Sequence, residues 1–213
     1  MIAIIDYGMA ILRSVERALI AVGGEPVITG DPEVVAKADH VILPGVGAFC
    51  ACMSNLNDRG LSDSVKQAIS SGKPFLGICV GMQMLFDTSS EMGASPGLKQ
   101  FPGSVIKFFE DERPVSAENL KVPHIGWNTL TVNPKSRLLA GLTDGDRVYF
   151  VHSYYPVPAD NSVVAATSDY GIEFCCAVER GNVAATQFHP EKSGAIGLQI
   201  LRNFIGWQTV VSA

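Results

Sequence analysis

The stretch that decides the fold is Phe75-Leu-Gly-Ile-Cys-Val-Gly-Met-Gln-Met-Leu85. Its apolar start predicts a buried strand over residues 74–78, and a helical pattern follows over residues 80–86. Cys79 stands between the two, with one glycine two positions before it and another two positions after it. A nucleophile on a sharp strand-to-helix turn needs such small neighbours, because larger side chains would collide. The stretch therefore predicts an exposed sulfur at the carboxyl end of a strand.

This turn would also favour the reactive form of the cysteine. A helix N-terminus stabilises the thiolate over the thiol, and the thiolate is the nucleophile. The backbone N–H of Val80 would point toward an oxygen that develops on an attacked carbonyl. Taken alone, however, a cysteine in a glycine-rich turn has about even odds of being a small buried hydrophobe instead. That structural interpretation is given to the remaining cysteines, Cys50, Cys52, Cys175 and Cys176, because the odd count suggests no disulfide framework and no zinc-like Cys/His cluster occurs.

The first half of the chain alternates short apolar runs with helical patterns. Further strands are expected at residues 2–5, 27–28 and 41–43, and helices at residues 9–22 and 61–70. Such alternation indicates an α/β fold with a mainly parallel sheet covered by helices on both faces.

The second half contains several β-like runs separated by proline and glycine. They predict partly antiparallel strands that extend the sheet, followed by a final helix over residues 194–207. The chain has 213 residues, so a single domain over residues 1–213 is expected. The runs lie at residues 105–109, 147–151, 163–167, 174–178 and 183–186.

A histidine follows the last of these strands. The sequence continues from Val183 as Ala-Ala-Thr-Gln-Phe-His-Pro-Glu, so His189 also falls at a strand end. Pro190 restricts His189 to extended conformations, and residues i and i+2 of an extended chain point to the same side. The imidazole and the Glu191 carboxylate can therefore lie side by side. A lone His-Pro-Glu is usually a surface turn, but beside an elbow cysteine it predicts a nucleophile, a base and an orienting acid. His40, which opens a predicted strand, is expected to be structural.

A third element is Leu43-Pro-Gly-Val-Gly47, which follows the strand at residues 41–43. A glycine-rich turn presents backbone N–H groups without side chains in the way. Gly45, Val46 and Gly47 are therefore candidates for a second oxyanion donor. A phosphate cradle is the competing interpretation, but no third glycine stands at the required spacing and no Gly-Lys-Ser/Thr follows.

The composition excludes several classes of function. The net charge is −5 and no basic run offsets it, which argues against a nucleic-acid or anionic-membrane partner. The longest charge-free stretch, residues 40–57, contains proline and two glycines and would make a poor membrane helix. The N-terminus enters a strand pattern at once, without a signal-peptide pattern, so a cytosolic (cytoplasmic) protein is expected.

The motifs Gly77-x-Cys79-x-Gly81-x-Gln83 and His189-Pro-Glu191 resemble those of the class I, or triad, glutamine amidotransferases. More narrowly, the chain is similar to the glutaminase subunits of imidazole glycerol phosphate synthases, which act in histidine biosynthesis. The similarity runs almost from end to end, and the segments at residues 124–128 and 191–193 are the most specific. Its other markers are residues 6–9, 12–15, 43–49, 149–154 and 187–190.

The resemblance implies a defined chemistry. Cys79 would attack the side-chain amide of glutamine, His189 would protonate the departing ammonia and then activate water, and Glu191 would fix the histidine tautomer. Val80 N–H and the strand over residues 45–47 would form the oxyanion hole. No metal or organic cofactor is implied. The residues expected to contact glutamine are Gln83, Ser153 and Tyr154.

The resemblance also implies a heterodimer. The partner would be a cyclase subunit with a (β/α)8-barrel fold, which receives ammonia through a tunnel and converts a ribulosyl phosphate intermediate. The products would be imidazole glycerol phosphate and an aminoimidazole carboxamide ribotide. Trp127, Tyr149 and Lys192 match interface positions of the family. Nothing in this chain looks like the acceptor site, which agrees with the need for a partner.

One segment departs from the family pattern. The family usually reads Asp-Tyr-Gly-Met-Gly-Asn near the N-terminus, whereas Ala10 and Ile11 replace the last glycine and asparagine here. The change removes a polar contact and some backbone freedom beside the site. It is expected to affect docking or signalling and to leave the triad intact.

Three alternatives remain open at this point. The chain could be a glutaminase that serves pyridoxal phosphate or anthranilate synthesis, although the segments around Trp127 and Lys192 argue against this. A stand-alone γ-glutamyl hydrolase would cleave without a partner. A non-catalytic regulatory module is disfavoured by the intact Cys79, His189 and Glu191.

Overall fold

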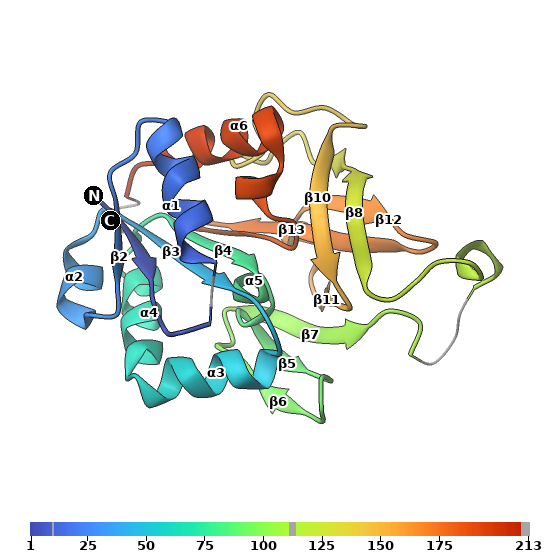
Figure 1. Ribbon diagram of the computed structural model, residues 1–213, viewed down its shortest axis with the longest axis horizontal. Helices are drawn as coiled ribbons and strands as arrows, with labels where there is room; N and C mark the ends of the chain where they lie inside the picture. The colour runs from blue at the N-terminus through green and yellow to red at the C-terminus, as the bar shows by residue number, and fades with distance from the viewer. Residues whose placement is uncertain (10, 111–113, 210–213) are drawn as a thin grey trace.

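The computed structural model describes residues 1–9, 11–110 and 114–209 (Figure 1). Its largest element is an eight-stranded sheet with parallel and antiparallel parts. The parallel part confirms the predicted alternation of strands and helices. It runs in the order β2 (Pro26–Thr29), β1 (Ile2–Ile5), β3 (His40–Gly45), β4 (Phe75–Cys79) and β14 (Val183–Thr186). The antiparallel part continues with β13 (Glu173–Arg180), β12 (Val164–Asp169) and β9 (Thr131–Val132).

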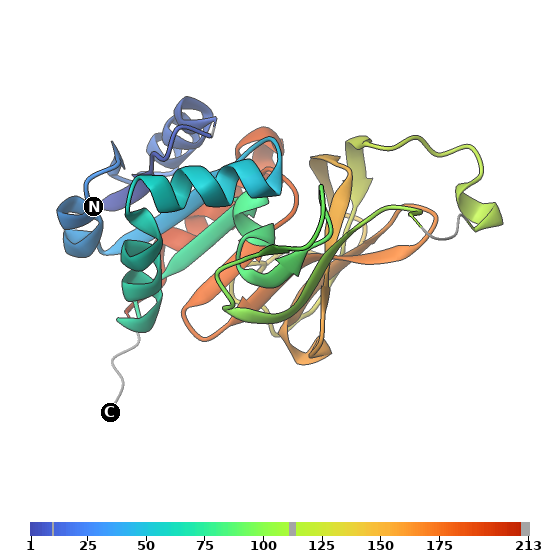
Figure 2. The ribbon, with the colours of Figure 1, turned by 90° about the horizontal axis from the view of Figure 1, so that it is seen from below.

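Helices cover both faces of the parallel part (Figures 1 and 2). On one face α1 (Leu12–Ala21) packs beside α6 (Gly194–Ile205). On the other face α3 (Phe49–Asp58) and α2 (Pro32–Lys37) both contact α4 (Leu61–Ser70). Strands β1 and β4 are apolar along their whole length, and all their residues are buried.

Two smaller sheets form a second layer beside β13. One pairs β10 (Arg147–His152) with β8 (His124–Thr129). The other has the order β11 (Tyr154–Pro158), β7 (Phe101–Lys107), β5 (Phe86–Ser89) and β6 (Ser95–Pro96). The prediction that residues 105–109 and 147–151 extend the main sheet is therefore wrong. Alternate residues of β10 face inward, and Phe150 packs on Phe174 of β13 and on Phe188, so this strand lies over the main sheet instead of beside it.

The predicted helix over residues 80–86 is also wrong in length. It is the single turn α5 (Val80–Gln83), and the chain resumes as strand β5 at Phe86. The carbonyl of Met84 accepts a hydrogen bond from Leu98 N, and the carbonyl of Leu85 accepts from two further amides. Because these carbonyls bind the incoming chain, the helix cannot continue.

Other predicted bounds agree closely with the structure. The elements at residues 2–5, 61–70 and 183–186 have the predicted limits. α1 begins at Leu12, not at residue 9, and α6 ends at Ile205. Three short 3-10 helices complete the order: η1 (Val115–Ala117), η2 (Asn161–Val163) and η3 (Pro190–Lys192).

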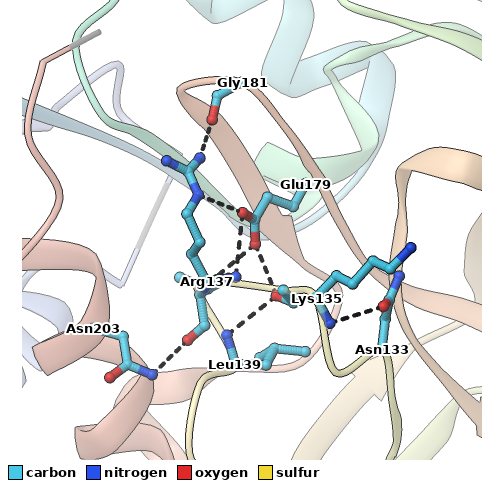
Figure 3. A network of polar contacts seen from close by, with 9 residues as sticks. Asn133, Lys135, Arg137, Leu139, Glu179, Gly181 and Asn203 are labelled. Carbon is cyan, nitrogen blue, oxygen red and sulfur yellow. Dashed lines mark hydrogen bonds and ion pairs between the residues drawn. The ribbon is translucent and has the colours of Figure 1, made fainter.

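The carboxylate of Glu179 fastens the connection between β9 and β10 to the sheet (Figure 3). It accepts hydrogen bonds from Ser136 Oγ at 2.8 Å, Arg137 Nε at 2.9 Å and Leu138 N at 3.1 Å. Asn203 of α6 donates to the carbonyl of Leu138 at 2.8 Å. The connection that leads into β10 is thus fixed to both β13 and α6.

A contiguous hydrophobic core joins both halves of the chain, from Ile2 to Trp207. Cys175 and Cys176 of β13 and Cys52 of α3 are buried in it, and Cys50 is half-buried, so none of the four departs from its structural interpretation. His40 opens β3 and its Nε2 lies 3.1 Å from the Trp207 carbonyl, as expected for a structural histidine. Within the described ranges, no helix has the length and apolar character needed to cross a membrane.

Candidate functional site

The site begins at the sharp turn after β4. Cys79 is the last residue of this strand and has φ 56° and ψ −114°, a conformation that is strained for a residue with a side chain. A Cβ added to Gly81 would lie 1.9 Å from the carbonyl oxygen of Leu43, and one added to Gly77 would lie 2.8 Å from that of Gly81. Neither position can hold a side chain, which confirms the predicted need for glycine around the cysteine.

The sequence places two further groups at the same edge of the sheet. In the β3–β4 register Gly45 lies beside Cys79, and β14 pairs with the other side of β4. The chain leaving β14 reaches His189, whose Nδ1 lies 2.7 Å from Glu191 Oε1. The side chains of this histidine and glutamate are 2% and 1% exposed, so their ion pair is shielded from solvent. The predicted pairing across Pro190 is therefore present.

The charge state of His189 follows from these neighbours. Burial acts to lower its pKa, but the Cys79 sulfur and the Glu191 carboxylate act in the opposite direction and raise the pKa to about 10. The imidazole is therefore protonated at neutral pH. Its Nε2 has no hydrogen-bond partner of normal geometry among the described residues, although the sulfur is near enough to affect its charge. Because α5 is a single turn, its dipole stabilises a thiolate at Cys79 less than the dipole of a longer helix would. The positive charge on His189 therefore contributes the larger part of that stabilisation.

Cys79 and His189 open into one cavity of about 370 Å³. Nearly all the predicted contact residues line it, and Gly45 and Glu191 border a smaller adjoining space behind His189. The residues predicted for the oxyanion hole and for glutamine binding that line it are Val46, Gly47, Val80, Gln83, Ser153 and Tyr154. Lys192, which is predicted for the partner interface, lines it as well.

The glycine-rich strand lies in the predicted place, but one amide points elsewhere. The N–H of Val46 donates to the carbonyl of Met9 at 3.1 Å, so in this conformation it does not face the cavity. Tyr7 donates its hydroxyl to the Pro44 carbonyl at 2.8 Å, and a Cβ at Gly45 would lie 2.7 Å from that hydroxyl. Gly47 has φ +93°, which glycine adopts without strain. Tyr7 thus packs against the strand, and the bond to Met9 directs the Val46 N–H away from the sulfur.

The three predicted interface residues form one surface patch next to the cavity, in which Trp127 is exposed and Tyr149 and Lys192 are half-buried. Trp127 of β8 and Tyr149 of β10 are register partners with ring centroids 6.1 Å apart. Lys192 Nζ lies 5.9 Å from the centroid of the Tyr149 ring. Trp127 is 48% exposed and Ile125, two residues before it, is 59% exposed, so the tryptophan is not a core residue. We call Ile125, Trp127, Tyr149 and Lys192 the outer patch.

Sequence reasoning did not single out the side chains of Glu91, His152 and Gln187. Glu91 lines the cavity and accepts a hydrogen bond from Phe49 N at 2.6 Å, at the start of α3. It lies in the turn between β5 and β6, and no sequence pattern marks it. His152 and Gln187 stand within quoted motifs, but only the structure brings their side chains to the cavity wall or to the sulfur.

The departure near the N-terminus falls partly outside the described residues. Ala10 lies outside them. Ile11 lines the cavity and occupies the N-cap position of α1 without a side-chain hydrogen bond. An asparagine at this position could accept such a bond, which is typically worth about 1 kcal/mol, whereas isoleucine cannot.

No group of three or more histidine, cysteine, aspartate or glutamate residues is arranged to hold a metal ion in the part of the chain that the structure describes.

The fold and the site together define an α/β protein with a cysteine at a strand-to-helix elbow, next to a histidine held by a glutamate. The family model described as glutamine amidotransferase class-I matches residues 3–207. The chain therefore belongs to the class-I glutamine amidotransferases.

Curated relatives narrow the family further. The chain is 54% identical over 203 residues to the imidazole glycerol phosphate synthase subunit HisH of Geobacter sulfurreducens, covering 95% of this chain and 97% of that protein. It is 48% identical to the HisH subunit of Geobacillus kaustophilus, covering 98% of each. Within its class, the chain belongs to the family of these HisH subunits.

Solved structures agree on the fold. A crystal structure of a glutamine amidotransferase has a TM-score of 0.70 at 20% identity, covering 95% of this chain and 96% of that one. PurLQS from Thermotoga maritima has a TM-score of 0.68 at 19% identity, covering 96% of each chain. The shared architecture is therefore retained where most of the sequence differs.

Proposed function

We propose that this protein is the glutaminase subunit of an imidazole glycerol phosphate synthase, with Cys79 as its nucleophile. It hydrolyses L-glutamine to glutamate and ammonia and passes the ammonia to a partner that uses it in histidine biosynthesis. The observation that carries the assignment is the buried His189–Glu191 pair, with Nδ1 and Oε1 2.7 Å apart, in the same cavity as the elbow sulfur.

The reaction follows from these three side chains. The Cys79 thiolate attacks the side-chain amide carbon of glutamine, and the C–N bond breaks as His189 gives its Nε2 proton to the departing nitrogen. Ammonia leaves and a γ-glutamyl thioester remains. His189, now neutral, takes a proton from water, whose oxygen attacks the thioester and releases glutamate and the thiolate. Glu191 keeps the proton on Nδ1 throughout, so that Nε2 alone exchanges protons with the substrate.

Polar groups of the cavity suit the two ends of the substrate. The Glu91 carboxylate, which lines the same cavity, would pair with the α-ammonium group of glutamine. Gln83 would contribute only its carbonyl oxygen, because both hydrogens of its amide are donated to protein acceptors, Tyr154 O and Gln187 Oε1, each at 3.0 Å. Val80 N–H and the strand over residues 45–47 would stabilise the oxyanion, and backbone groups of Ser153 and Tyr154 would complete the cavity.

The partner that fits the outer patch is a cyclase subunit with a (β/α)8-barrel fold, bound as a heterodimer. Exposed aromatic residues beside a cavity are typical of a docking surface. Lys192 belongs both to the patch and to the cavity wall, so docking there would close the route by which ammonia escapes into solvent. A cytoplasmic location and a single domain over residues 1–213 belong to the same proposal.

Control of the reaction would act on the Val46 amide. Its bond to the Met9 carbonyl withholds an oxyanion donor, and rotation of this peptide would direct the N–H at the substrate. Gly45 and Gly47 give the strand the freedom for that rotation. Crystal structures with and without a ligand on the partner, showing the same peptide orientation in both, would count against this control.

The decisive experiment compares glutamine-dependent and ammonia-dependent synthesis by the complex. Cys79→Ala should abolish the first and leave the second, because ammonia needs no thioester. Cys175→Ala, at a buried cysteine remote from the cavity, is the matched control and should keep both activities. Loss of both activities in Cys79→Ala alone would instead assign the cysteine to assembly.

A stand-alone γ-glutamyl hydrolase is the competing function, and turnover without the partner separates the two. We expect low glutaminase activity from the isolated chain and a large increase with the cyclase subunit carrying its nucleotide ligand. Full activity in isolation would favour the hydrolase, and it would also remove the proposed role of the Val46 amide.

A further inference from the structure

The nucleophile has a second polar neighbour besides His189. Gln187 follows β14, two residues before His189, and is fully buried. Its Nε2 lies 3.8 Å from Cys79 Sγ. This amide stabilises a thiolate only if it directs an N–H, and not its oxygen, toward the sulfur.

The hydrogen-bond partners of the amide fix its orientation. The carbonyl oxygen of Tyr154 can only accept, so Gln83 must direct its Nε2 toward it, at 3.0 Å. The same Nε2 gives its other hydrogen to Gln187 Oε1, also at 3.0 Å. With its oxygen bound in this way, Gln187 can present only N–H to Cys79.

A second branch reaches the same carbonyl from the opposite direction. His152 Nδ1 lies 2.9 Å from Tyr154 O and must therefore carry a hydrogen. Burial lowers the pKa of His152 to about 3, so the ring is neutral and its Nε2 accepts. His124 Nδ1 lies 3.1 Å from that Nε2 and donates to it. Asn128 Nδ2, 3.4 Å from His124 Nε2, ends the branch on β8.

Backbone groups also fix the outer end of this branch. Asn128 donates from Nδ2 to the Asp169 carbonyl at 2.7 Å, and its Oδ1 accepts from Thr129 N at 2.8 Å. Each amide and imidazole from Cys79 to β8 thus has one possible orientation. Both branches donate to Tyr154 O, so the chain cannot carry a proton from β8 to the sulfur. It is a fixed scaffold of dipoles, and proton transfer stays with His189.

We infer that Gln187 is a further catalytic residue, whose amide N–H stabilises the Cys79 thiolate, and that Gln83 and the His124–His152 pair are positioning residues that hold this N–H in place. The inference rests on the proposed role of Cys79 as nucleophile. Of the other titratable groups near the sulfur, Tyr7 and Cys52 are neutral because burial raises the pKa of both, and His152 is neutral because burial lowers its pKa. Glu91 and Lys192 line the same cavity. The charge that interacts directly with the sulfur is that of His189, and the Gln187 amide adds a directed partial charge.

The test measures how fast iodoacetamide alkylates Cys79 as a function of pH, with the full-length chain and peptide mapping. Gln187→Met keeps the shape of the side chain and removes the donor. It should move the midpoint of the rate profile upward by about one pH unit, as expected for one hydrogen bond to a charged group. Gln187→Glu sets a carboxylate against the sulfur and should move the midpoint further. In the complex, kcat should fall roughly 10-fold in Gln187→Met, with KM changed less than kcat.

Two further variants separate catalysis from packing. Thr186→Val removes an equally buried hydrogen bond, from Thr186 Oγ1 to Phe188 O at 2.9 Å, without touching the sulfur, and should leave the midpoint unchanged. His152→Leu removes a positioning residue and should shift the midpoint in the same direction as Gln187→Met, by less. An unchanged midpoint in both Gln187 variants would overturn the inference.

The same experiment distinguishes that failure from failure of the proposed function. If Cys79 is not the nucleophile, the unchanged protein will show no preferential alkylation at Cys79, and Cys79→Ala will retain glutamine-dependent synthesis. If Cys79 reacts preferentially but the Gln187 variants match the unchanged protein, the nucleophile stands and only the role of Gln187 is removed.

Discussion

At the scale of single residues, the proposed chemistry depends on a charged histidine inside the protein. His189 is shielded from water, which alone would leave it neutral, yet a carboxylate on one side and a sulfur on the other keep it protonated. Such a histidine is ready to give a proton to departing ammonia, and its charge favours a thiolate beside it. The cost of burying the Glu191 charge is offset because its partner lies at 2.7 Å.

Glu191→Gln should lower kcat by roughly 10²–10⁴-fold, since the histidine loses the group that fixes its tautomer. The same change removes one of the two causes that raise the His189 pKa, so the loss of activity at alkaline pH should begin at a lower pH. The pH profile of glutamine turnover by the complex tests both effects. An alkaline limb at the same pH in the two proteins would show that His189 does not set it.

The raised pKa has a counterpart in stability. The folded-state value of about 10 exceeds the ordinary value of 6.5, so protonated His189 stabilises the fold fully below pH 6.5. That contribution is lost as the pH rises through about 10. The free energy of unfolding, measured with urea, should therefore decline between pH 7 and 10, and the decline should be smaller in Glu191→Gln than in the unchanged protein.

The buried pair His124 and His152 should make the protein sensitive to acid. Burial lowers their pKa values to about 4 and about 3, below the 6.5 of an unfolded chain. The unfolded state therefore binds more protons below pH 6.5, and stability falls as the pH drops toward 4. Between pH 6.5 and 4.5 the free energy of unfolding, measured with urea, should fall by about 2–3 kcal/mol less in His152→Gln than in the unchanged protein.

His40→Gln is the matched control for this effect. His40 is half-buried, and both the Trp207 carbonyl and Asp39 oppose the lowering of its pKa by burial. Replacing His40 should change the dependence of the unfolding free energy on pH less than replacing His152 does. If both variants show the same pH dependence, the acid sensitivity belongs to other groups.

At this scale the sequence predicts residues that act through short-range spacing. Cys79, His189 and Glu191 are found because the elbow glycines and the His-Pro-Glu spacing restrict the backbone locally. Glu91 reaches the cavity only through the packing of the β5–β6 turn on α3, and Gln187 is oriented by Gln83, which is itself fixed by the Tyr154 carbonyl. No local pattern records such contacts.

At the scale of elements, the elbow depends on close contact between α5 and β3. Gly81→Ala would place a methyl group 1.9 Å from the Leu43 carbonyl, so the helix or the strand must move. We expect a loss of about 1–3 kcal/mol of stability, as for other overpacked sites, and a fall in kcat of at least 10-fold because Cys79 moves with the helix.

Gly206→Ala is the control for the elbow. Gly206 has φ −77°, and its added Cβ would lie no closer than 3.4 Å to Asn203 O. Stability and turnover should change little in this variant. If Gly81→Ala behaves like Gly206→Ala in thermal unfolding and in turnover, the elbow tolerates a side chain and the packing argument fails.

The elements also show where pattern reading stops. The runs at residues 2–5 and 183–186 predict β1 and β14 with their observed bounds, because every residue of these two strands is buried. The helix over residues 80–86 is cut short by carbonyls that bind residues 98–101, which no local pattern shows. α3 is not among the predicted elements, although the buried residues Phe49, Cys52, Met53 and Leu56 are spaced like one helix face.

At the scale of the whole molecule, the small β8–β10 sheet joins the outer patch to the cavity. Phe150 on the inner side of β10 packs on Phe174 and Phe188, and Trp127 and Tyr149 are register partners on the outer side. Figure 1 shows β8 and β10 side by side. The sequence predicts β10 but not its layer, because strand propensity does not say which neighbour a strand will pair with. A partner seated on this sheet would therefore press on the residues that hold His189.

The connection from that sheet to the triad passes through Ser193. Its Oγ accepts from Tyr149 N at 3.0 Å and donates to the His189 carbonyl at 2.6 Å, while His189 N donates to Tyr149 O at 3.0 Å. The backbone of the proposed base is thus bonded directly to a residue of the outer patch. Movement of β10 on docking would therefore reach His189 by two routes, through Ser193 and through the direct bond between His189 N and Tyr149 O.

Ser193→Ala should therefore weaken activation by the partner. We expect the ratio of glutamine turnover with and without the cyclase subunit to fall severalfold, and stability to fall by about 1–3 kcal/mol because Tyr149 N loses its acceptor. Ser168→Ala is the matched control: Ser168 is also buried and donates to the Thr129 carbonyl at 2.8 Å, at the end of β8 away from His189. It should lose comparable stability and keep the ratio. Equal activation ratios in the two variants would mean that docking reaches the cavity by another route, such as the Met9 contact of Val46.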